Sequence, residues 1–278
     1  MGTQELSIAE KMLLSTIRIE TQTSLGTCTG TGFFLELKHD PLNNMSVPVV
    51  VTNKHVIKDA KTGKLRFSVE DNDGNPMWGD SYDVTFDNFE SRWIMHPDEN
   101  IDLCVLPIAS IHQLVAKQNK RLLYASVILD DIPSDEVLKR EYSRIEDITV
   151  IGYPDGIWDS VNNNPIVRKG ITATPLQADF NGASDFLVDV AIYPGSSGSP
   201  VYIFNQGAYA TSAGINIGSR VSLVGVIHAT FQHRINGSVG VVDVPAAKVP
   251  IFESMIPNNL GLAIHARKLR DFEQFFPD

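Results

Sequence analysis

Short apolar and β-branched runs, separated by clusters of turn-forming residues, follow one another along most of this chain. Turn clusters such as residues 71–76 (DNDGNP) separate these runs. Many short strands with turns between them are typical of β-sandwiches and β-barrels, so we expect an all-β fold. The expected strands cover residues 16–20, 26–37, 47–52, 65–69, 82–86, 93–95 and 101–108, then 145–152, 166–175, 186–192, 200–204, 222–231 and 239–244.

Helical patterns are confined to short segments. Ser7 and Glu10 form a capping-box pattern, which predicts a short helix that ends near Leu14. Residues 134–140 predict one or two helical turns within a connecting segment. The tail from residue 266 to 276 carries apolar residues at helical spacing and predicts an amphipathic C-terminal helix. We therefore expect two β-rich halves joined near residues 111–145, followed by a closing helix.

The charge of the chain limits the classes of partner. Its 278 residues include 33 acidic and 23 basic side chains, and the net charge is −10. Nucleic acids and anionic membranes favour clustered Lys and Arg, so neither is an expected partner. No apolar run approaches the roughly 18 residues of a membrane span, and residues 1–11 lack the pattern of a signal peptide. We expect a cytoplasmic protein; a processed form of an exported chain is the alternative.

Metal and disulfide chemistry is not indicated. Cys28 and Cys104 lie far apart and outside any CxxC pattern, so we expect both to be reduced and buried. Five histidines also lack the spacing of metal ligands. We therefore predict no metal and no cofactor, with structural or surface roles for His39, His96, His112, His233 and His265.

The segment 193–201 (YPGSSGSPV) is the strongest candidate for chemistry. It lies between the apolar runs 186–192 and 201–204 and is rich in Gly, Ser and Pro. Such a turn brings backbone N–H groups close to a ligand, as the oxyanion hole of an acyl-transfer enzyme requires. The G-x-S-G-x-P pattern makes Ser197 the candidate nucleophile. The candidate oxyanion donors are the N–H groups of Gly195 and Ser197, because glycine tolerates unusual backbone angles.

Two earlier segments supply the groups that would activate this serine. An apolar strand ends at His55, and Asp102 lies within the apolar run 101–106. A serine hydroxyl is a weak nucleophile until a base takes its proton, and histidine is the natural base near neutral pH. A buried carboxylate fixes the imidazole tautomer and stabilises the imidazolium. Each residue alone has an ordinary structural explanation, but the order His55, Asp102, Ser197 favours a catalytic triad.

At this point the sequence resembles the trypsin-like serine peptidases, and most closely the catalytic domain of the bacterial HtrA/Deg type. No PDZ-like domain follows residue 264, and no basic residue followed by Ile-Val-Gly-Gly precedes the first half. The resemblance therefore implies neither peptide sensing by a PDZ domain nor activation by zymogen cleavage. The matching segments are residues 30–34 (GTGFF), 51–57 (VTNKHVI), 102–106 (DLCVL), 151–154 (IGYP), 191–200 (AIYPGSSGSP), 224–226 (VGV) and 260–264 (LGLAI).

The resemblance implies two perpendicular six-stranded antiparallel β-barrels with the active site between them. His55 and Asp102 would come from the first barrel and Ser197 from the second. The whole chain, residues 1–278, would form a single peptidase domain. Its parts would be an N-terminal helix and first barrel (1–115), a connection (116–145), a second barrel (146–265) and a C-terminal helix (266–278).

The resemblance also indicates the substrate-binding residues. Ala191, six residues before the nucleophile, would lie at the base of the primary pocket, so a preference for Lys or Arg is not expected. His228, Ala229 and Thr230 would form the pocket wall and pair with the substrate strand. We favour a small or medium apolar P1 residue. An acidic or amide P1 stays open, because related enzymes with that preference place a histidine in this wall, two residues after the strand glycine, whereas His228 lies three residues after Gly225. Many family members have Gly where this chain has Ser199, but some glutamyl-specific members also have Ser there.

Two functions of different classes remain. The first is a serine endopeptidase that forms an acyl-enzyme on Ser197, acts on a polypeptide substrate and responds to an activating or regulatory protein. The second is a catalytically silent module that holds an extended peptide or a partner protein in the same cleft. The presence of all three triad residue types favours the enzyme.

Overall fold

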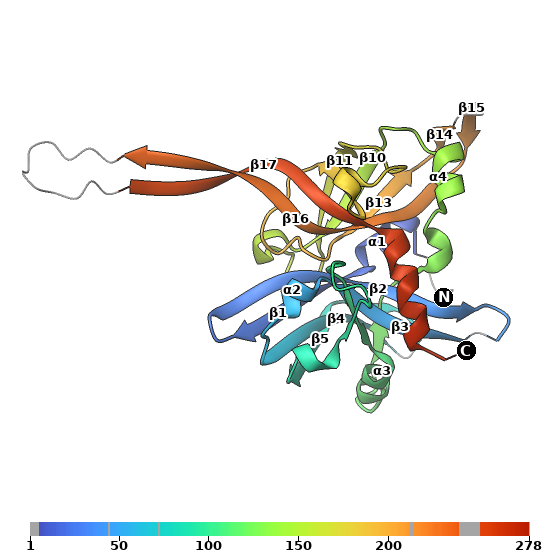
Figure 1. Cartoon of the computed structure of the whole chain (residues 1–278). Coiled ribbons are helices and arrows are strands. Elements are labelled where there is room, and N and C mark those ends of the chain that lie inside the picture. The colour runs from blue at the N-terminus through green and yellow to red at the C-terminus, as the bar shows by residue number, and fades with distance from the viewer. Residues whose placement is uncertain (1–5, 44, 72, 212–213, 239–250, 278) are drawn as a thin grey trace, which may run out of the picture.

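Two β-rich halves packed against each other make up the structure, with one long hairpin extending from the second half (Figure 1). This computed structural model describes residues 6–43, 45–71, 73–211, 214–238 and 251–277, and for residues 232–238 and 251–257 it describes the backbone only. The predicted mostly-β fold class is confirmed. Within the described residues, no helix has both the length and the apolar character that a membrane crossing needs.

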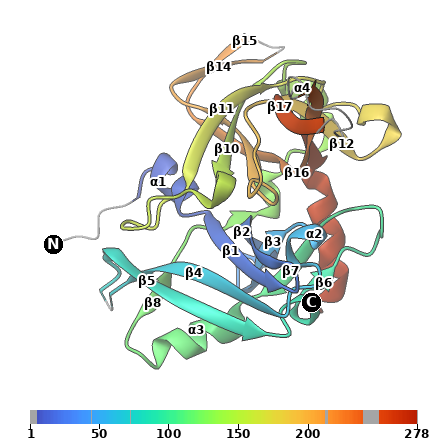
Figure 2. The same ribbon diagram turned by 90° about the vertical axis from the view of Figure 1, so that its left-hand side faces the viewer.

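The first half is one antiparallel sheet with a single parallel pairing (Figure 2). The strand order is β5-β4-β1-β2-β3-β7-β6, with β8 paired to β4 and β9 paired to β2. The pairing therefore joins nine strands, whereas the resemblance implied a closed barrel of six. Three of the nine have only two or three residues, too few to give a periodic signal in the sequence. The strands are β1 (Thr16–Thr23), β2 (Gly26–Asp40), β3 (Met45–Thr52), β4 (Thr62–Glu70), β5 (Pro76–Asp87), β6 (Ile94–Met95), β7 (Cys104–Pro107), β8 (Arg121–Leu123) and β9 (Val127–Ile128).

The second half is a closed six-stranded barrel, as predicted, in the order β10-β11-β12-β17-β16-β13. Its inward-facing residues alternate along the strands and form a core of aliphatic side chains with Phe186. A separate ribbon, β14 and β15, lies beside it. The strands are β10 (Asp147–Gly152), β11 (Ile166–Thr172), β12 (Asp185–Asp189), β13 (Pro200–Asn205), β14 (Ala208–Thr211), β15 (Gly214–Ile217), β16 (Arg220–Ser238) and β17 (Ile251–His265).

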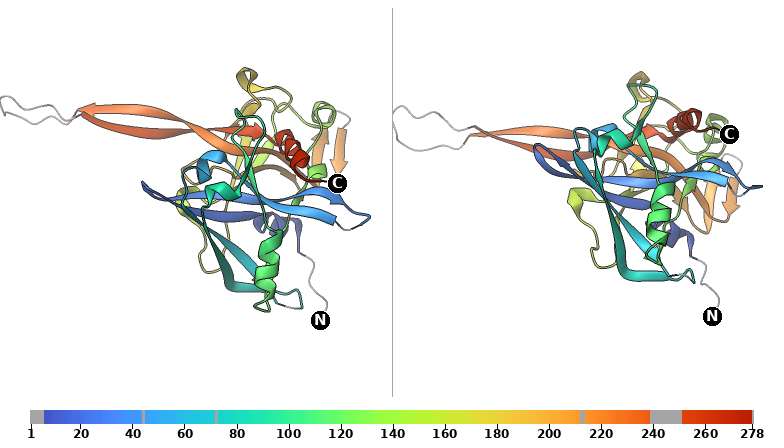
Figure 3. Two further views of the ribbon diagram at one scale, coloured as in Figure 1. Left: turned by 60° about the horizontal axis from the view of Figure 1, so that its bottom comes forward. Right: turned by 90° about the horizontal axis from the view of Figure 1, so that it is seen from below.

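The last two barrel strands continue past the barrel as a two-stranded arm (Figures 1 and 3). β16 pairs with β13 only up to Val226, and β17 pairs with β12 only over residues 260–264. Beyond these points the two strands pair with each other as far as Ser238 and Ile251. The predicted strand at 222–231 is thus much longer than expected, and the predicted strand at 239–244 lies outside the described residues.

The helices are short, and two of them begin as the sequence predicts. Ser7 and Glu10 form the full capping box of α1, and the Ser134 hydroxyl accepts a hydrogen bond from the Val137 amide at the start of α4. The predicted C-terminal helix is present with 3₁₀ hydrogen bonding, and it buries Leu269 and Phe272. The helices are α1 (Ile8–Leu13), α2 (Lys54–Ile57), α3 (Ala109–Ala116), α4 (Asp135–Glu141), η1 (Glu90–Arg92), η2 (Leu129–Asp131), η3 (Pro154–Gly156), η4 (Phe180–Gly182) and η5 (Ala266–Phe275).

A core shared by the two halves fixes their relative position. It joins Phe33 and Leu103 of the first half to Tyr202 and Leu223 of the barrel, and Phe272 of η5 closes it. The helix that follows the barrel therefore packs against both halves. Each half also has a hydrophobic core of its own.

The two cysteines do not share one environment, which corrects the expectation that both are buried. Cys104 on β7 is buried, and burial raises the pKa of its thiol. Cys28 is exposed. It lies in the first few residues of β2, which with β1 extend past the core as a hairpin, and burial along β2 begins at Gly30.

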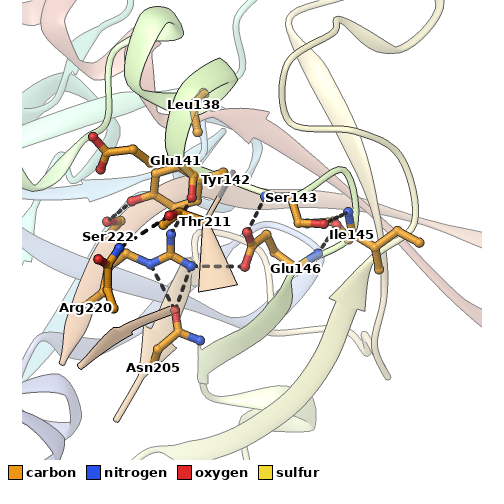
Figure 4. Close-up of polar contacts among 12 residues, drawn as sticks. Leu138, Glu141, Tyr142, Ser143, Ile145, Glu146, Asn205, Thr211, Arg220 and Ser222 are labelled. Atoms are coloured by element: carbon orange, nitrogen blue, oxygen red, sulfur yellow. Dashed lines mark hydrogen bonds and ion pairs between the residues drawn. The ribbon is translucent and has the colours of Figure 1, made fainter. Parts of the chain in front are cut away.

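A buried ion pair ties the end of the connecting segment to the barrel (Figure 4). Arg220 at the start of β16 and Glu146 are each 8% exposed, with 3.1 Å between Nη2 and Oε2. The guanidinium also donates to Asn205 Oδ1 and to the Glu141 carbonyl, and it lies 4.1 Å from the ring centre of Tyr142. This one side chain thus joins α4, β13 and β16.

Candidate active site

His55 and Asp102 form a direct pair at the edge of the first half. β3 ends at Thr52, and the single-turn helix α2 that follows carries His55. Its Nδ1 lies 2.5 Å from Asp102 Oδ2, and its backbone N–H donates to Oδ1 over 3.1 Å. The carboxylate therefore holds both the ring and the backbone of the same histidine. This arrangement leaves Nε2 as the ring nitrogen available to a substrate or to a serine.

Asn53 fixes the chain around this pair. Its side chain is buried, and Nδ2 donates to the Asp102 carbonyl over 2.8 Å. Asp102 is then followed by the buried Leu103 and Cys104, which leads into β7. Asn53, the residue before α2, is therefore bonded through its side chain to the backbone of Asp102, which lies shortly before β7. Sequence reasoning did not single out Asn53.

The turn that carries Ser197 is held between the two halves. Thr31 N–H donates to the Ser197 carbonyl, and Gly198 N–H donates to the Ile227 carbonyl on β16. Gly198 has φ +86°, and a Cβ at that position would lie 2.0 Å from the Thr31 carbonyl oxygen. Only glycine fits this crossing, since an L side chain would meet both a strained backbone and a steric clash. The predicted nucleophile therefore lies on a turn fixed by backbone contacts on both sides.

Thr31 is the contact that brings the serine turn to the histidine side. Its hydroxyl donates to the Gly195 carbonyl over 2.8 Å and accepts the Tyr153 N–H over 3.1 Å. Its own carbonyl accepts the Thr52 hydroxyl over 2.7 Å, just ahead of His55. Sequence reasoning quoted Thr31 only within GTGFF. The signal was a polar residue between two glycines, directly before the apolar run 33–35.

The candidate triad has one of its two links, the bond between His55 and Asp102. No hydrogen bond joins the His55 ring to the Ser197 hydroxyl among the contacts of the described residues. His55 is 45% exposed at its side chain, and Ser197 is half-buried, so both groups are open to a ligand. In free enzymes this link is often long and tightens only in the substrate complex.

The backbone around Gly195 contains two amides without an acceptor in the described part of the chain. The Pro194 carbonyl accepts the Asp155 N–H over 2.5 Å. The carbonyl and N–H of one trans peptide point in opposite directions, so Gly195 N–H faces away from Asp155. Neither Gly195 N–H nor Ser197 N–H donates to an acceptor within the described part of the chain. Two free amides on one tight turn are the donors that a developing oxyanion needs.

The sequence matches the profile of the trypsin-like peptidase domain over residues 30–209, well over half of the chain. This chain belongs to the trypsin-like peptidase domain family. The match includes the three predicted triad positions and the turn around Ser197. The sequence matches no curated protein.

Solved structures of HtrA-type proteases share the fold of this peptidase domain. AlgW, solved as a serine-to-alanine variant with a tripeptide, superposes with a TM-score of 0.50 at 16% identity. That match covers 97% of this chain and 63% of AlgW, so the chain spans less than two thirds of its relative's length. The serine endoprotease from Yersinia pestis gives a TM-score of 0.48 at 15% identity over 98% of this chain and 67% of that one. At 16% identity, the similarity to AlgW concerns the fold alone.

The predicted substrate-binding residues of the peptidase domain lie on segments next to the serine turn. Ala191 is half-buried just before the turn, and Ile227 of β16 exchanges hydrogen bonds with Gly198 and Ser199. His228 follows at a bulge in β16, with Nε2 3.4 Å from Asp185 Oδ1. The Asp185 carboxylate was not singled out from the sequence, and it lies near His228 Nε2 without forming a hydrogen bond.

Ala229 and Thr230 continue the same strand. Ala229 is exposed, whereas the Thr230 hydroxyl donates to the Leu260 carbonyl on β17 over 3.0 Å. Thr230 therefore joins the two strands of the arm through its side chain as well as through its pairing with Gly261. Within the described residues, no three His, Cys, Asp or Glu side chains gather as a metal site requires.

Proposed function

We propose that this protein is a serine endopeptidase that cleaves polypeptides through an acyl-enzyme on Ser197. The observation that carries the proposal is the pairing of His55 with Asp102 beside a turn whose Gly195 and Ser197 amides are both free. A structural turn would satisfy its backbone donors, since an unpaired amide costs free energy.

The reaction follows from these groups. His55 Nε2 takes the Ser197 hydroxyl proton as Oγ attacks the scissile carbonyl, and the Asp102 carboxylate stabilises the imidazolium. The oxyanion is bound by the Gly195 and Ser197 amides. The imidazolium then gives its proton to the leaving amine, which leaves an ester on Ser197. His55 next activates a water molecule that hydrolyses the ester and restores the serine.

A fluorophosphonate probe tests the proposal without knowledge of the substrate. We expect the wild type to be labelled on Ser197, and Ser197→Ala to lose all labelling. Ser199→Ala is the matched control, because Ser199 is a fully buried serine two positions away whose hydroxyl has no hydrogen-bond partner. Removal of the Ser199 hydroxyl should therefore leave the labelling of Ser197 unchanged. Hydrolysis of unfolded casein by the wild type, absent in Ser197→Ala, extends the result to peptide bonds.

A catalytically silent peptide-binding module is the second candidate. The missing hydrogen bond between His55 and Ser197 favours it, because a serine without its base is inert. Absence of labelling in every condition, together with binding of an extended peptide, would support this candidate over the enzyme. Labelling that depends on Ser197 excludes it.

For the substrate, we propose a small or medium apolar P1 residue. The Asp185 carboxylate beside His228 supports this choice, because it would repel an acidic P1 side chain near that imidazole. A profile of cleavage sites for the wild type and His228→Ala tests it: the same apolar preference is expected in both. A preference for Glu or Gln that disappears in His228→Ala would contradict it. An activating partner and a cytoplasmic location stay predictions.

A further inference from the structure

A buried histidine connects the loop of Asp102 to the C-terminal helix. The His96 side chain has no exposed surface, and it lies just after β6, at the start of the loop 96–103. The backbone N–H of His96 donates to the Leu103 carbonyl over 2.9 Å, which closes the loop at its base. Asp102 is the residue next to that closure. The mechanism described above makes no use of His96.

The two ring nitrogens of His96 bond to different parts of the fold. Asp98 N–H donates to Nδ1 over 3.1 Å, so Nδ1 is an acceptor and the ring proton is on Nε2. Nε2 lies 3.1 Å from the Lys268 carbonyl on η5, to which it donates, and 3.3 Å from Asp271 Oδ2. The ring also packs edge-on against Phe272, with 5.2 Å between centroids. One imidazole thus bonds the loop to η5.

The loop itself passes this restraint on toward the catalytic pair. Asp98 Oδ1 accepts the Asn100 N–H over 2.9 Å, and the Asp98 carbonyl accepts both Ile101 N–H and Lys54 Nζ. Lys54 is the residue before His55 on α2. The loop between His96 and Asp102 is therefore held at one end by η5 and at the other by the segment that carries the histidine.

We infer that His96 is a positioning residue that sets the Asp102 carboxylate against His55 by bonding the loop 96–103 to the C-terminal helix. The inference rests on the proposed function, because it names a further residue on which the same triad depends. Removal of the ring nitrogens frees the loop from η5. A shift of about 1 Å in such a group can cost about 10²-fold in rate.

His96→Phe removes both hydrogen bonds while it keeps an aromatic ring against Phe272. We expect the rate of fluorophosphonate labelling at Ser197 to fall about 10- to 100-fold. His265→Phe is the matched control. His265 is also a buried histidine packed against a phenylalanine, 5.0 Å from Phe186, but it belongs to the barrel and not to the loop of Asp102. It should lose stability without a comparable loss of labelling.

The NMR spectrum reports the His55–Asp102 bond directly and needs no substrate. A short bond between an imidazole N–H and a carboxylate gives a downfield proton resonance, which should be present in the wild type and absent in Asp102→Ala. In spectra recorded well below the unfolding temperature of each variant, we expect this resonance to be weakened or shifted in His96→Phe and unchanged in His265→Phe. A purely structural role for His96 would lower the melting temperature and leave the resonance unchanged.

The outcomes separate the inference from the proposed function. If the wild type is never labelled, the endopeptidase proposal fails, and the resonance still tests whether His96 positions Asp102. If His96→Phe keeps both the resonance and the wild-type labelling rate, the inference is wrong although the enzyme stands. If His96→Phe does not fold, His96→Gln replaces it, because its amide can still donate to Lys268 but does not reproduce the ring. Gln is then expected to retain part of the labelling rate, and full retention would overturn the inference.

Discussion

Gly195 determines which way the peptide before it faces. It has φ +89°, and a Cβ at this position would lie 2.5 Å from the Tyr153 carbonyl oxygen. An alanine would have to leave this conformation and rotate the 194–195 peptide, which would turn the Gly195 N–H away from the oxyanion position. The position thus has a steric reason to be glycine, and the proposed function would add a second.

We predict that Gly195→Ala lowers the rate of acylation at Ser197 by about 10²- to 10³-fold, the typical loss of one oxyanion donor. Labelling kinetics with a fluorophosphonate measure the change. Gly207→Ala is the control, because Gly207 has a similar φ of +85° with nothing within 4 Å of its Cβ position. It carries the same backbone strain without the clash. Equal losses of activity in both variants would show that strain alone accounts for the effect.

The Thr31 hydroxyl is a second single group that holds the Ser197 turn in place, through its hydrogen bonds to Gly195 and Tyr153. Thr31→Val keeps the shape of the side chain and leaves the Tyr153 N–H and the Gly195 carbonyl without their partner. We expect a loss of about 1–3 kcal/mol in the free energy of unfolding and slower labelling of Ser197. Urea denaturation and labelling kinetics measure the two effects. Thr31→Ser retains the hydroxyl and should stay close to wild type in labelling.

Among the elements, the start of β16 is the point at which the barrel and the connecting segment are joined. Replacement of Arg220 by Met would leave the buried Glu146 carboxylate without its partner. We predict a loss of about 3–5 kcal/mol in the free energy of unfolding, the usual cost of breaking a buried ion pair from one side. Urea denaturation measures it.

The double variant Arg220→Met with Glu146→Gln is the control for that loss, since it removes both charges. It should recover a large part of the stability, because no uncompensated charge is left in the barrel. If the loss of stability in the double variant equals the sum of the losses in Arg220→Met and in Glu146→Gln, Arg220 acts through its contacts with Asn205 and Tyr142 instead of through the ion pair.

His265, at the end of β17, makes the free energy of unfolding depend on pH. Burial, with a smaller contribution from the Arg267 charge, lowers the pKa of His265 from its usual 6.5. The unfolded chain therefore binds more protons at this site below about pH 6.5, so the folded state loses stability as the pH falls through that value. Above about pH 6.5 the site contributes no such loss.

We predict that the free energy of unfolding falls between about pH 7 and about pH 5, and falls less in His265→Phe. Thermal or urea unfolding at each pH measures the difference between the two proteins. Taking the difference removes the contribution of the other titrating groups. Parallel curves for the two proteins would show that His265 does not carry the effect.

At the scale of the whole molecule, we predict that the arm formed by β16 and β17 contributes little to the stability of the fold. Its distal parts, residues 232–238 and 251–257, pair only with each other in the described strand ladders. We therefore expect that replacement of the distal part of the arm, from residue 232 to residue 257, by a short Gly-containing turn changes the free energy of unfolding by no more than about 0.5 kcal/mol. Denaturation measures this, and Ser197 labelling should persist. A large loss of stability would mean that the arm packs on the barrel.

The sequence predicted those features of the fold and site that depend on short, local patterns. The capping box of α1 and the glycine-rich turn at Ser197 each depend on a few adjacent residues, and the structure contains both. The apolar strand before His55 is also present, but it ends at Thr52, and His55 lies on the helix α2. The contacts that join the halves could not be predicted in this way, because they connect distant segments through single groups. Thr31 to Gly195 is one example. The contact of Asp185 with His228 lies within the barrel, and it too connects segments far apart in the sequence.

Features with weak periodicity were also missed. The N-terminal strands of two or three residues are too short for a pattern, and the helix α3 turns only Ile111 and Val115 toward the core. The extended pairing of β16 with β17 was hidden because its second strand includes Pro257 and several polar residues, which interrupt a strand pattern.

The bond from Asp155 to the Pro194 carbonyl has a thermodynamic consequence for ligands of this turn. The bond from the Asp155 N–H fixes the orientation of this peptide within the fold, so a bound carbonyl or phosphonyl oxygen does not have to supply free energy to rotate it. Preorganisation of this kind removes the affinity penalty that arises when only a fraction of molecules is competent to bind. A tetrahedral mimic should then associate in a single step, at a rate proportional to its concentration with no plateau from a slow isomerisation.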